Sequence, residues 1–314
     1  MPTDVTSTPS ARMRTSPDVP PAAIDMRWIP GGTFAMGSDD FYPEERPVHR
    51  VTVDGFWMDA SPVTAADFRR FVREAAYVTV AERPLDTGLY PDAEPELLVP
   101  GSILFRMTSG PVDLDDNRNW WKYVPGAYWK RPGGRGTTIN GRDQHPVVQV
   151  AYEDAEAYAV WAGKELPSEA EWELAARGGL DGAVFAWGDE HFPDGKAMGN
   201  TWQGEFPWQN LKLDGYGGTS PVGSFPPNGY RLYDMTGNTW EWTSDWFRSD
   251  PSGEESPCCA PPTLPGERFP RKVIKGGSHP CAPNYCLRYR PAARQGEAID
   301  TSTGHIGFRC IVRG

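Results

Sequence analysis

Apolar and polar residues alternate along the first structured part of the chain. The stretches MRWIPGGTFAMGS, from residue 26, and HRVTVDGFWMD, from residue 49, place apolar side chains at every second position over short runs. A period of two is typical of strands that bury one face. We therefore predict short strands within 26–38 and 49–59. Residues 80–145 show no such period and hold three tryptophans among glycines and prolines, so we expect loops there.

Three later segments carry a helical pattern instead. Residues 64–76 begin with Thr64, a favoured N-cap residue, and residues 152–163 place apolar side chains on one face. The third helix starts at a capping box formed by Ser168 and Glu171 and ends at Gly178, which favours the left-handed C-cap conformation. Beyond residue 178 only short strands and turns are predicted.

The pattern and composition together favour one turn-rich domain. Residues 1–24 are rich in Pro, Ser, Thr and Ala and predict a disordered tail, so the folded domain is expected over 25–314. The chain has 34 glycines and 32 prolines, which predict many turns, and 13 tryptophans, whose rings can pack loops together. We find no internal repeat or linker.

Charge and hydropathy exclude two classes of partner. The net charge is −11 with a pI near 5, whereas proteins that bind nucleic acids usually present a basic face. No apolar run reaches the roughly 18 residues that a membrane span needs. The first residues lack the apolar centre of a signal peptide, so we expect a cytoplasmic protein, and we expect a monomer.

Two of the five cysteines, Cys281 and Cys286, lie close enough in the sequence to form a catalytic or metal-binding pair. The turn-prone Pro283 and Asn284 lie between them and allow the two sulfurs to meet. A disulfide needs sulfurs about 2.05 Å apart, whereas two thiolates bridging one metal ion linearly would lie about 4.5 Å apart. Zinc normally takes four ligands, and the adjacent Cys258-Cys259 would be poor chelators, so Cu(I) suits an isolated pair best. The residues alone leave copper, a redox disulfide and two core thiols open.

Two arginines follow the pair in the sequence CLRYR. If these residues form a strand, Cys286, Arg288 and Arg290 share one face. An arginine there would offset the charge of a copper bis-thiolate and favour deprotonated sulfurs.

Five separated segments resemble the formylglycine-generating enzymes, also called sulfatase-modifying factors. The most specific is GGSHPCAPNYCLRYR, since the WAGKELPSEAEWE and GNTWEWTSDW blocks also mark a wider superfamily. The resemblance covers about residues 26–314. It implies an α+β fold, a single C-type-lectin-like domain with little regular secondary structure. The segments that carry it are 145–179, 200–207, 225–247, 276–294 and 304–310.

The resemblance also implies an activity. A formylglycine-generating enzyme is a copper-dependent oxidase that converts the cysteine of a C-x-P-x-R motif in unfolded or nascent sulfatases to formylglycine, using O₂ and a thiol reductant. Here Cys281 and Cys286 would hold Cu(I), leaving room for the substrate sulfur. The family's active-site serine and metal-side tryptophan fall on Ser278 and Trp240, and Tyr285 is a candidate for placing a proton near the oxygen site.

Two residues are implied in substrate binding, Arg290 and His305. The family often has asparagine where this chain has His305, which could donate a hydrogen bond to substrate or compete as a soft-metal ligand. His279, two residues before Cys281, is more simply a loop residue than a third copper ligand. Cys310 matches a disulfide-bonded cysteine of secreted relatives but lacks the partner, so we expect a free buried thiol in a reducing compartment.

Calcium is the second metal that the resemblance implies, as a fastener for turn-rich structure. Carboxylate and carbonyl oxygens would bind it, although Asp-Gly clusters are also ordinary turns. One set is Asn200, the Thr201 carbonyl, Asp214 and the Tyr216 carbonyl; the other is Asp234, the Gly237 and Thr239 carbonyls and Glu241.

Two rival interpretations share the scaffold. A non-catalytic C-type-lectin-like binding module would explain the tryptophans and the calcium sets but would give the cysteine pair no task. An iron-dependent sulfoxide synthase would need an additional helical domain and a histidine-rich site, and the five scattered histidines argue against it.

Overall fold

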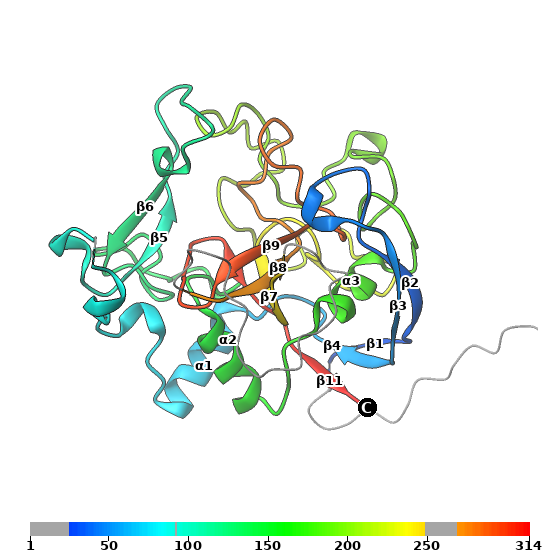
Figure 1. Cartoon of the computed structure of the whole chain (residues 1–314), viewed down its shortest axis with the longest axis horizontal. Coiled ribbons are helices and arrows are strands. Elements are labelled where there is room, and N and C mark those ends of the chain that lie inside the picture. The colour runs from blue at the N-terminus through cyan, green and yellow to red at the C-terminus, as the bar shows by residue number, and fades with distance from the viewer. Residues whose placement is uncertain (1–24, 92, 249–268) are drawn as a thin grey trace, which may run out of the picture.

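The structure is a computed structural model that describes residues 25–91, 93–248 and 269–314. Long irregular connections link three short α-helices and several small sheets in these ranges, as the turn-rich composition predicts (Figure 1). The expected tail 1–24 and the pair Cys258-Cys259 lie outside the described residues. No helix within the described ranges is both long and apolar enough to cross a bilayer.

The predicted strands near the N-terminus are confirmed, and each stretch is split in two. The break after the first strand contains Gly31, whose φ of +64° is not a strand conformation. Only glycine fits at this position, because a Cβ would lie 2.6 Å from the backbone of Gly55. The strand after the second break pairs with the last strand of the chain, so a three-stranded sheet joins the two ends of the domain. The strands are β1 (Arg27–Ile29), β2 (Gly32–Met36), β3 (His49–Val53), β4 (Phe56–Met58) and β11 (Ile311–Arg313), in the sheets β1-β4-β11 and β2-β3.

A four-stranded sheet occupies the middle of the molecule (Figure 1). Its order is β10-β7-β8-β9, with β10 (Ile306–Gly307) parallel to β7 (Trp240–Trp246) and the other pairs antiparallel. Strands β8 (Arg271–Lys275) and β9 (Arg294–Ala298) enclose the cysteine segment, which leaves the sheet after Lys275 and returns at Arg294. The sheet therefore fixes both ends of that segment.

The loop prediction for 80–145 is wrong in part. Within it, β5 (Gly101–Phe105) and β6 (Trp121–Pro125) form an antiparallel hairpin, flanked by short 3₁₀ turns. The hairpin lies at one side of the molecule, opposite β2 and β3 (Figure 1). The two strands are separated by 15 residues, and each is stabilised by pairing with the other. A local sequence pattern does not reveal such a pairing.

The three helices form where the sequence predicts them, two of them from their caps and α2 (Tyr152–Trp161) from its apolar face. Thr64 accepts a hydrogen bond from the Asp67 N–H at the start of α1 (Ala65–Ala75), and Ser168 and Glu171 close the reciprocal box at the start of α3 (Glu169–Arg177). Gly178 ends α3 in the left-handed region, with φ 58°. Helix α2 (Tyr152–Trp161) packs with α1 over an aromatic core, while α3 packs on β7 and β8.

Candidate functional site

The cysteine segment doubles back through a single tight turn. Cys281 N–H donates to the Ser278 carbonyl at 2.8 Å, and the N–H groups of Tyr285 and Cys286 both donate to the Ala282 carbonyl, at 3.0 and 2.7 Å. This local geometry brings the two thiols close enough for each to change the pKa of the other. The predicted turn at residues 283 and 284 is confirmed, and both cysteines are free thiols.

The two sulfurs shift each other's pKa in opposite directions. The pKa of Cys281 is lowered because the neighbouring Cys286 thiol favours its thiolate, and the Ser278 N–H, 3.5 Å away, adds to the effect. The pKa of Cys286 is raised well above its usual value, because the neighbouring Cys281 sulfur disfavours its thiolate and because it is buried. Two soft sulfurs side by side, one of them with a lowered pKa, fit a monovalent soft cation, which would bind both as thiolates.

The pair has a buried side and an accessible side. Cys281 is 3% exposed and belongs to the aromatic core with Trp240, whereas Cys286 is half-buried. Tyr285, 38% exposed, stacks on Phe206 with ring centres 4.6 Å apart. A polypeptide would therefore approach from the side of Cys286 and Tyr285.

Two hydroxyl groups beside the pair have no hydrogen-bond partner among the described residues. Ser278 is fully buried; its hydroxyl lies close enough to favour the Cys281 thiolate electrostatically but without hydrogen-bond geometry. Tyr289, which the sequence analysis did not single out, is also fully buried, and the two cysteine sulfurs add to the burial that raises its pKa. Unpaired buried hydroxyls cost stability unless a ligand or water completes them.

Trp240, the first residue of β7, contacts His305, which lies directly before β10, through the backbone. The Trp240 N–H donates to the His305 carbonyl at 2.9 Å. The His305 ring stacks on Trp121 at 4.4 Å and lies 2.7 Å from the Thr303 hydroxyl. Burial lowers the pKa of His305 to about 3, so the ring is neutral at pH 7 and can serve as a hydrogen-bond partner but not as a cation.

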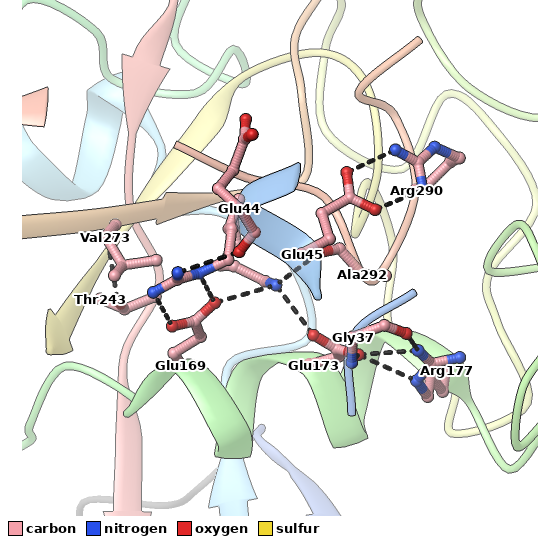
Figure 2. A network of polar contacts seen from close by, with 12 residues as sticks. Gly37, Glu44, Glu45, Glu169, Glu173, Arg177, Thr243, Val273, Arg290 and Ala292 are labelled. Atoms are coloured by element: carbon pink, nitrogen blue, oxygen red, sulfur yellow. Dashed lines mark hydrogen bonds and ion pairs between the residues drawn. The ribbon is translucent and has the colours of Figure 1, made fainter. Parts of the chain in front are cut away.

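The segment after Cys286 is not a strand, so its side chains do not alternate as the conditional strand model expects. Arg288 pairs with Glu44 at 2.6 Å. Arg290 is 1% exposed and places two nitrogens on the Glu45 carboxylate, at 2.6 and 2.9 Å (Figure 2). Arg290, expected to bind substrate, is therefore engaged inside the protein.

The first calcium set is partly assembled. The Gln203 side-chain amide donates to the Thr201 carbonyl at 2.6 Å and to the Asp214 carboxylate at 2.9 Å, so these two oxygens converge on one point. The Asp214 carboxylate also accepts from the Tyr216 N–H at 2.9 Å. The hard oxygen donors fit a calcium ion, provided that the Gln203 amide turns away.

The second calcium set fits less well. Arg309 donates to both oxygens of Glu241, and the Trp172 indole N–H donates to the same carboxylate at 2.8 Å. Glu241 is thereby already compensated. Burial raises the pKa of Asp234 to about 6. Among the described residues, no group of three or more His, Cys, Asp or Glu side chains is arranged to hold a metal ion.

A cavity of about 510 Å³ lies away from the cysteines, beside β5. Its walls are mostly apolar and include Ile103, Tyr90 and Phe269. It reaches Ser302, three residues before His305, but neither cysteine lines it.

Known proteins with similar sequences point to one family. The sulfatase-modifying factor enzyme 1-like domain matches residues 12–313. The formylglycine-generating enzyme of Mycobacterium tuberculosis is 56% identical over 90% of this chain and 96% of its own length, and that of Mus musculus is 45% identical over 94% and 77%. A Mus musculus relative named inactive Cα-formylglycine-generating enzyme 2 is 38% identical over 90% of this chain and 83% of its own length.

Solved structures agree on the fold. PvdO from Pseudomonas aeruginosa has a TM-score of 0.60 at 26% identity, covering 92% of this chain and 94% of its own. The expected α+β, C-type-lectin-like domain with little regular secondary structure is confirmed. The chain belongs to the sulfatase-modifying factor enzyme 1-like family.

Proposed function

We propose that this protein generates formylglycine, by oxidising the cysteine of a C-x-P-x-R motif in unfolded or nascent sulfatases. The observation that carries the proposal is the tight turn that places two free thiols side by side, Cys281 buried and Cys286 partly accessible. Relatives named formylglycine-generating enzyme, over nearly the whole chain, support it. Since the family also includes a relative named inactive, membership alone does not carry the activity.

The reaction balances with one O₂ and two external thiols. The substrate R–CH₂–SH, O₂ and two R′–SH give R–CHO, H₂S, R′–S–S–R′ and water. We propose that Cys281 and Cys286 hold Cu(I), which when bound would supply the redox chemistry that uses O₂. The protein itself holds the two sulfurs in place and excludes bulk water on the Cys281 side.

Other side chains then have defined tasks. The Ser278 hydroxyl, unpaired in the buried wall, donates a hydrogen bond to the incoming sulfur or oxygen. Trp240 packs in the apolar core on the Cys281 side of the pair. Tyr285 lies on the accessible side, where its phenol can donate or accept a proton. We propose that neutral His305 bonds the substrate backbone; Arg290 could do so only after releasing Glu45.

Calcium at the first set is part of the proposal, with Asp214 and Thr201 as ligands. We also propose a cytoplasmic location and a monomer. The location is supported by Cys310, which is a fully buried free thiol as expected and so suits a reducing compartment.

The test is conversion of a synthetic C-x-P-x-R peptide with O₂, a thiol reductant and Cu(I), followed by mass spectrometry. The peptide should lose its sulfur and gain an aldehyde. Cys281→Ala and Cys286→Ala should abolish conversion, whereas Cys310→Ala, which removes a buried thiol that is not part of the pair, should retain it. If the two cysteine variants converted peptide at the wild-type rate, the thiol pair would not be the catalytic site. If the wild-type protein did not convert the peptide at all, the non-catalytic binding module would be the better function.

A further inference from the structure

The segment that carries Cys286 rests on a turn from the other end of the chain. Residues 41–45, which include the 3₁₀ turn Pro43–Glu45, approach residues 287–290 across about 245 residues of sequence. No motif in the sequence marked this turn. Its side chains make contact with the backbone and the two arginines that follow the second cysteine.

The first contact is with the backbone next to Cys286. The Leu287 N–H donates to the Tyr42 hydroxyl at 3.0 Å. The Cys286 sulfur is near enough to Tyr42 to influence its pKa, which burial raises. Tyr42 therefore supplies the hydrogen-bond acceptor for the residue directly after the reactive thiol.

The second contact is a buried ion pair. Glu45 and Arg290 are each no more than 1% exposed, and two hydrogen bonds join them. The Arg290 guanidinium also lies over the Phe41 ring at 3.6 Å, and its Nε donates back to the Leu287 carbonyl at 2.8 Å. One guanidinium thus links the turn to Leu287, the residue directly after Cys286.

We propose that residues 41–45 form a positioning clamp that holds Cys286 at the correct distance from Cys281, with Tyr42 and Glu45 as the two holding points. Two-coordinate binding requires a defined separation of the sulfurs, and Cys286, unlike Cys281, is only half-buried. Hydrogen bonds to the residues after Cys286 add a directional restraint to the packing of Cys286 and Leu287 against the core. The clamp rests on the proposed function only as far as copper is concerned, because the spacing of the thiols is a property of the apoprotein.

The experiment uses Tyr42→Phe, which keeps the ring and removes the acceptor. Its control is Tyr152→Phe, since the Tyr152 hydroxyl bonds to Glu156 on the surface, away from the thiols. Binding of phenylarsine oxide, which needs two closely spaced thiols, is measured on the reduced apoprotein, and Cu(I) affinity by competition with a chelator. Tyr42→Phe should weaken both by about tenfold while its Tm stays close to that of Tyr152→Phe.

A second pair of variants separates the buried contact from its exposed neighbour. Glu45→Gln should weaken phenylarsine oxide binding more than Glu44→Gln, whose partner Arg288 is partly exposed. In peptide turnover, the clamp variants should lower kcat with little change in KM, as expected for misplaced sulfurs. If Glu45→Gln does not fold, the comparison of Tyr42→Phe with Tyr152→Phe still tests whether the clamp sets the spacing of the thiols.

Wild-type affinity for phenylarsine oxide in Tyr42→Phe would overturn the clamp. If the wild-type protein binds phenylarsine oxide but not Cu(I), the copper in the proposed function is wrong, and the arsenical comparison still decides on the clamp.

Discussion

Arg309 and Glu241 form an ion pair that is completely buried on both sides. The Arg309 Nε and Nη2 atoms donate to the two carboxylate oxygens at 2.7 and 2.8 Å, and Nη2 also donates to the Tyr233 carbonyl at 2.9 Å. The pair ties the GFRC segment near the C-terminus to the central sheet. Because the guanidinium neutralises Glu241, it also explains why the second calcium set fits an ion poorly.

Arg309→Lys should destabilise the protein by about 3 kcal/mol, although the charge is retained. A lysine presents a single nitrogen and cannot form the two-point contact, so buried acceptors lose their donors. Urea unfolding measures the loss. The surface substitution Arg69→Lys, at a pair with Asp143, should change stability by less than about 1 kcal/mol.

Gly277→Ala should damage both folding and activity. Gly277 has φ +66°, and a Cβ would lie 2.7 Å from the Arg288 carbonyl, so the new methyl group would push the two arms of the cysteine segment apart. We expect a stability loss of about 2 kcal/mol or more and weaker binding of phenylarsine oxide. Gly110→Ala, where a Cβ meets open space at ordinary φ, is the control and should leave both unchanged.

Stability should depend on pH through Asp154. Burial raises the pKa of this carboxyl to about 6, compared with about 3.9 in an unfolded chain. The folded state therefore binds the proton more tightly. Asp154 destabilises the fold above pH 6, and this loss, about 3 kcal/mol at most, fades as the pH falls from 6 to 4.

The measurement is urea unfolding of wild type and Asp154→Asn at several pH values. The wild type should gain stability relative to the variant between pH 7 and 4. Parallel stability curves for the two proteins would show that Asp154 titrates normally.

Calcium should raise the Tm of the wild-type protein, and EGTA should reverse the shift. At a calcium concentration 100 times the Kd, the stabilisation is about 2.7 kcal/mol. Asp214→Asn should abolish the shift, because it removes the carboxylate of the first set, whereas Asp143→Asn on the surface should preserve it. A shift that survives Asp214→Asn would place the ion elsewhere.

Local signals predicted the helices and the cysteine turn well. Thr64 and Ser168 mark helix starts because capping is a contact between residues three apart, and Pro283-Asn284 marks a turn for similar reasons. The hairpin of β5 and β6 escaped prediction because its pairing partner lies beyond any local window.

The supports of the thiol pair could not be predicted in the same way. Tyr42 and Glu45 reach the Cys286 segment only after the chain has folded, and nothing in the sequence FYPEE indicates a partner 245 residues away. The place of Tyr289 beside the thiols could not be predicted either, because an unpaired buried hydroxyl is recognised only once its neighbours in the fold are known.

The pairing of β11 with β4 has a consequence for synthesis of the protein. Residues 311–313 complete a sheet begun by residues 56–58, and Cys310 N–H donates to Asp59 at 2.9 Å. When the ribosome has translated residue 300, almost every element has been made. The sheet β1-β4-β11 still lacks β11, and the central sheet still lacks β10. The nascent chain therefore carries unpaired strand edges until its last residues are made, and such edges favour aggregation late in translation.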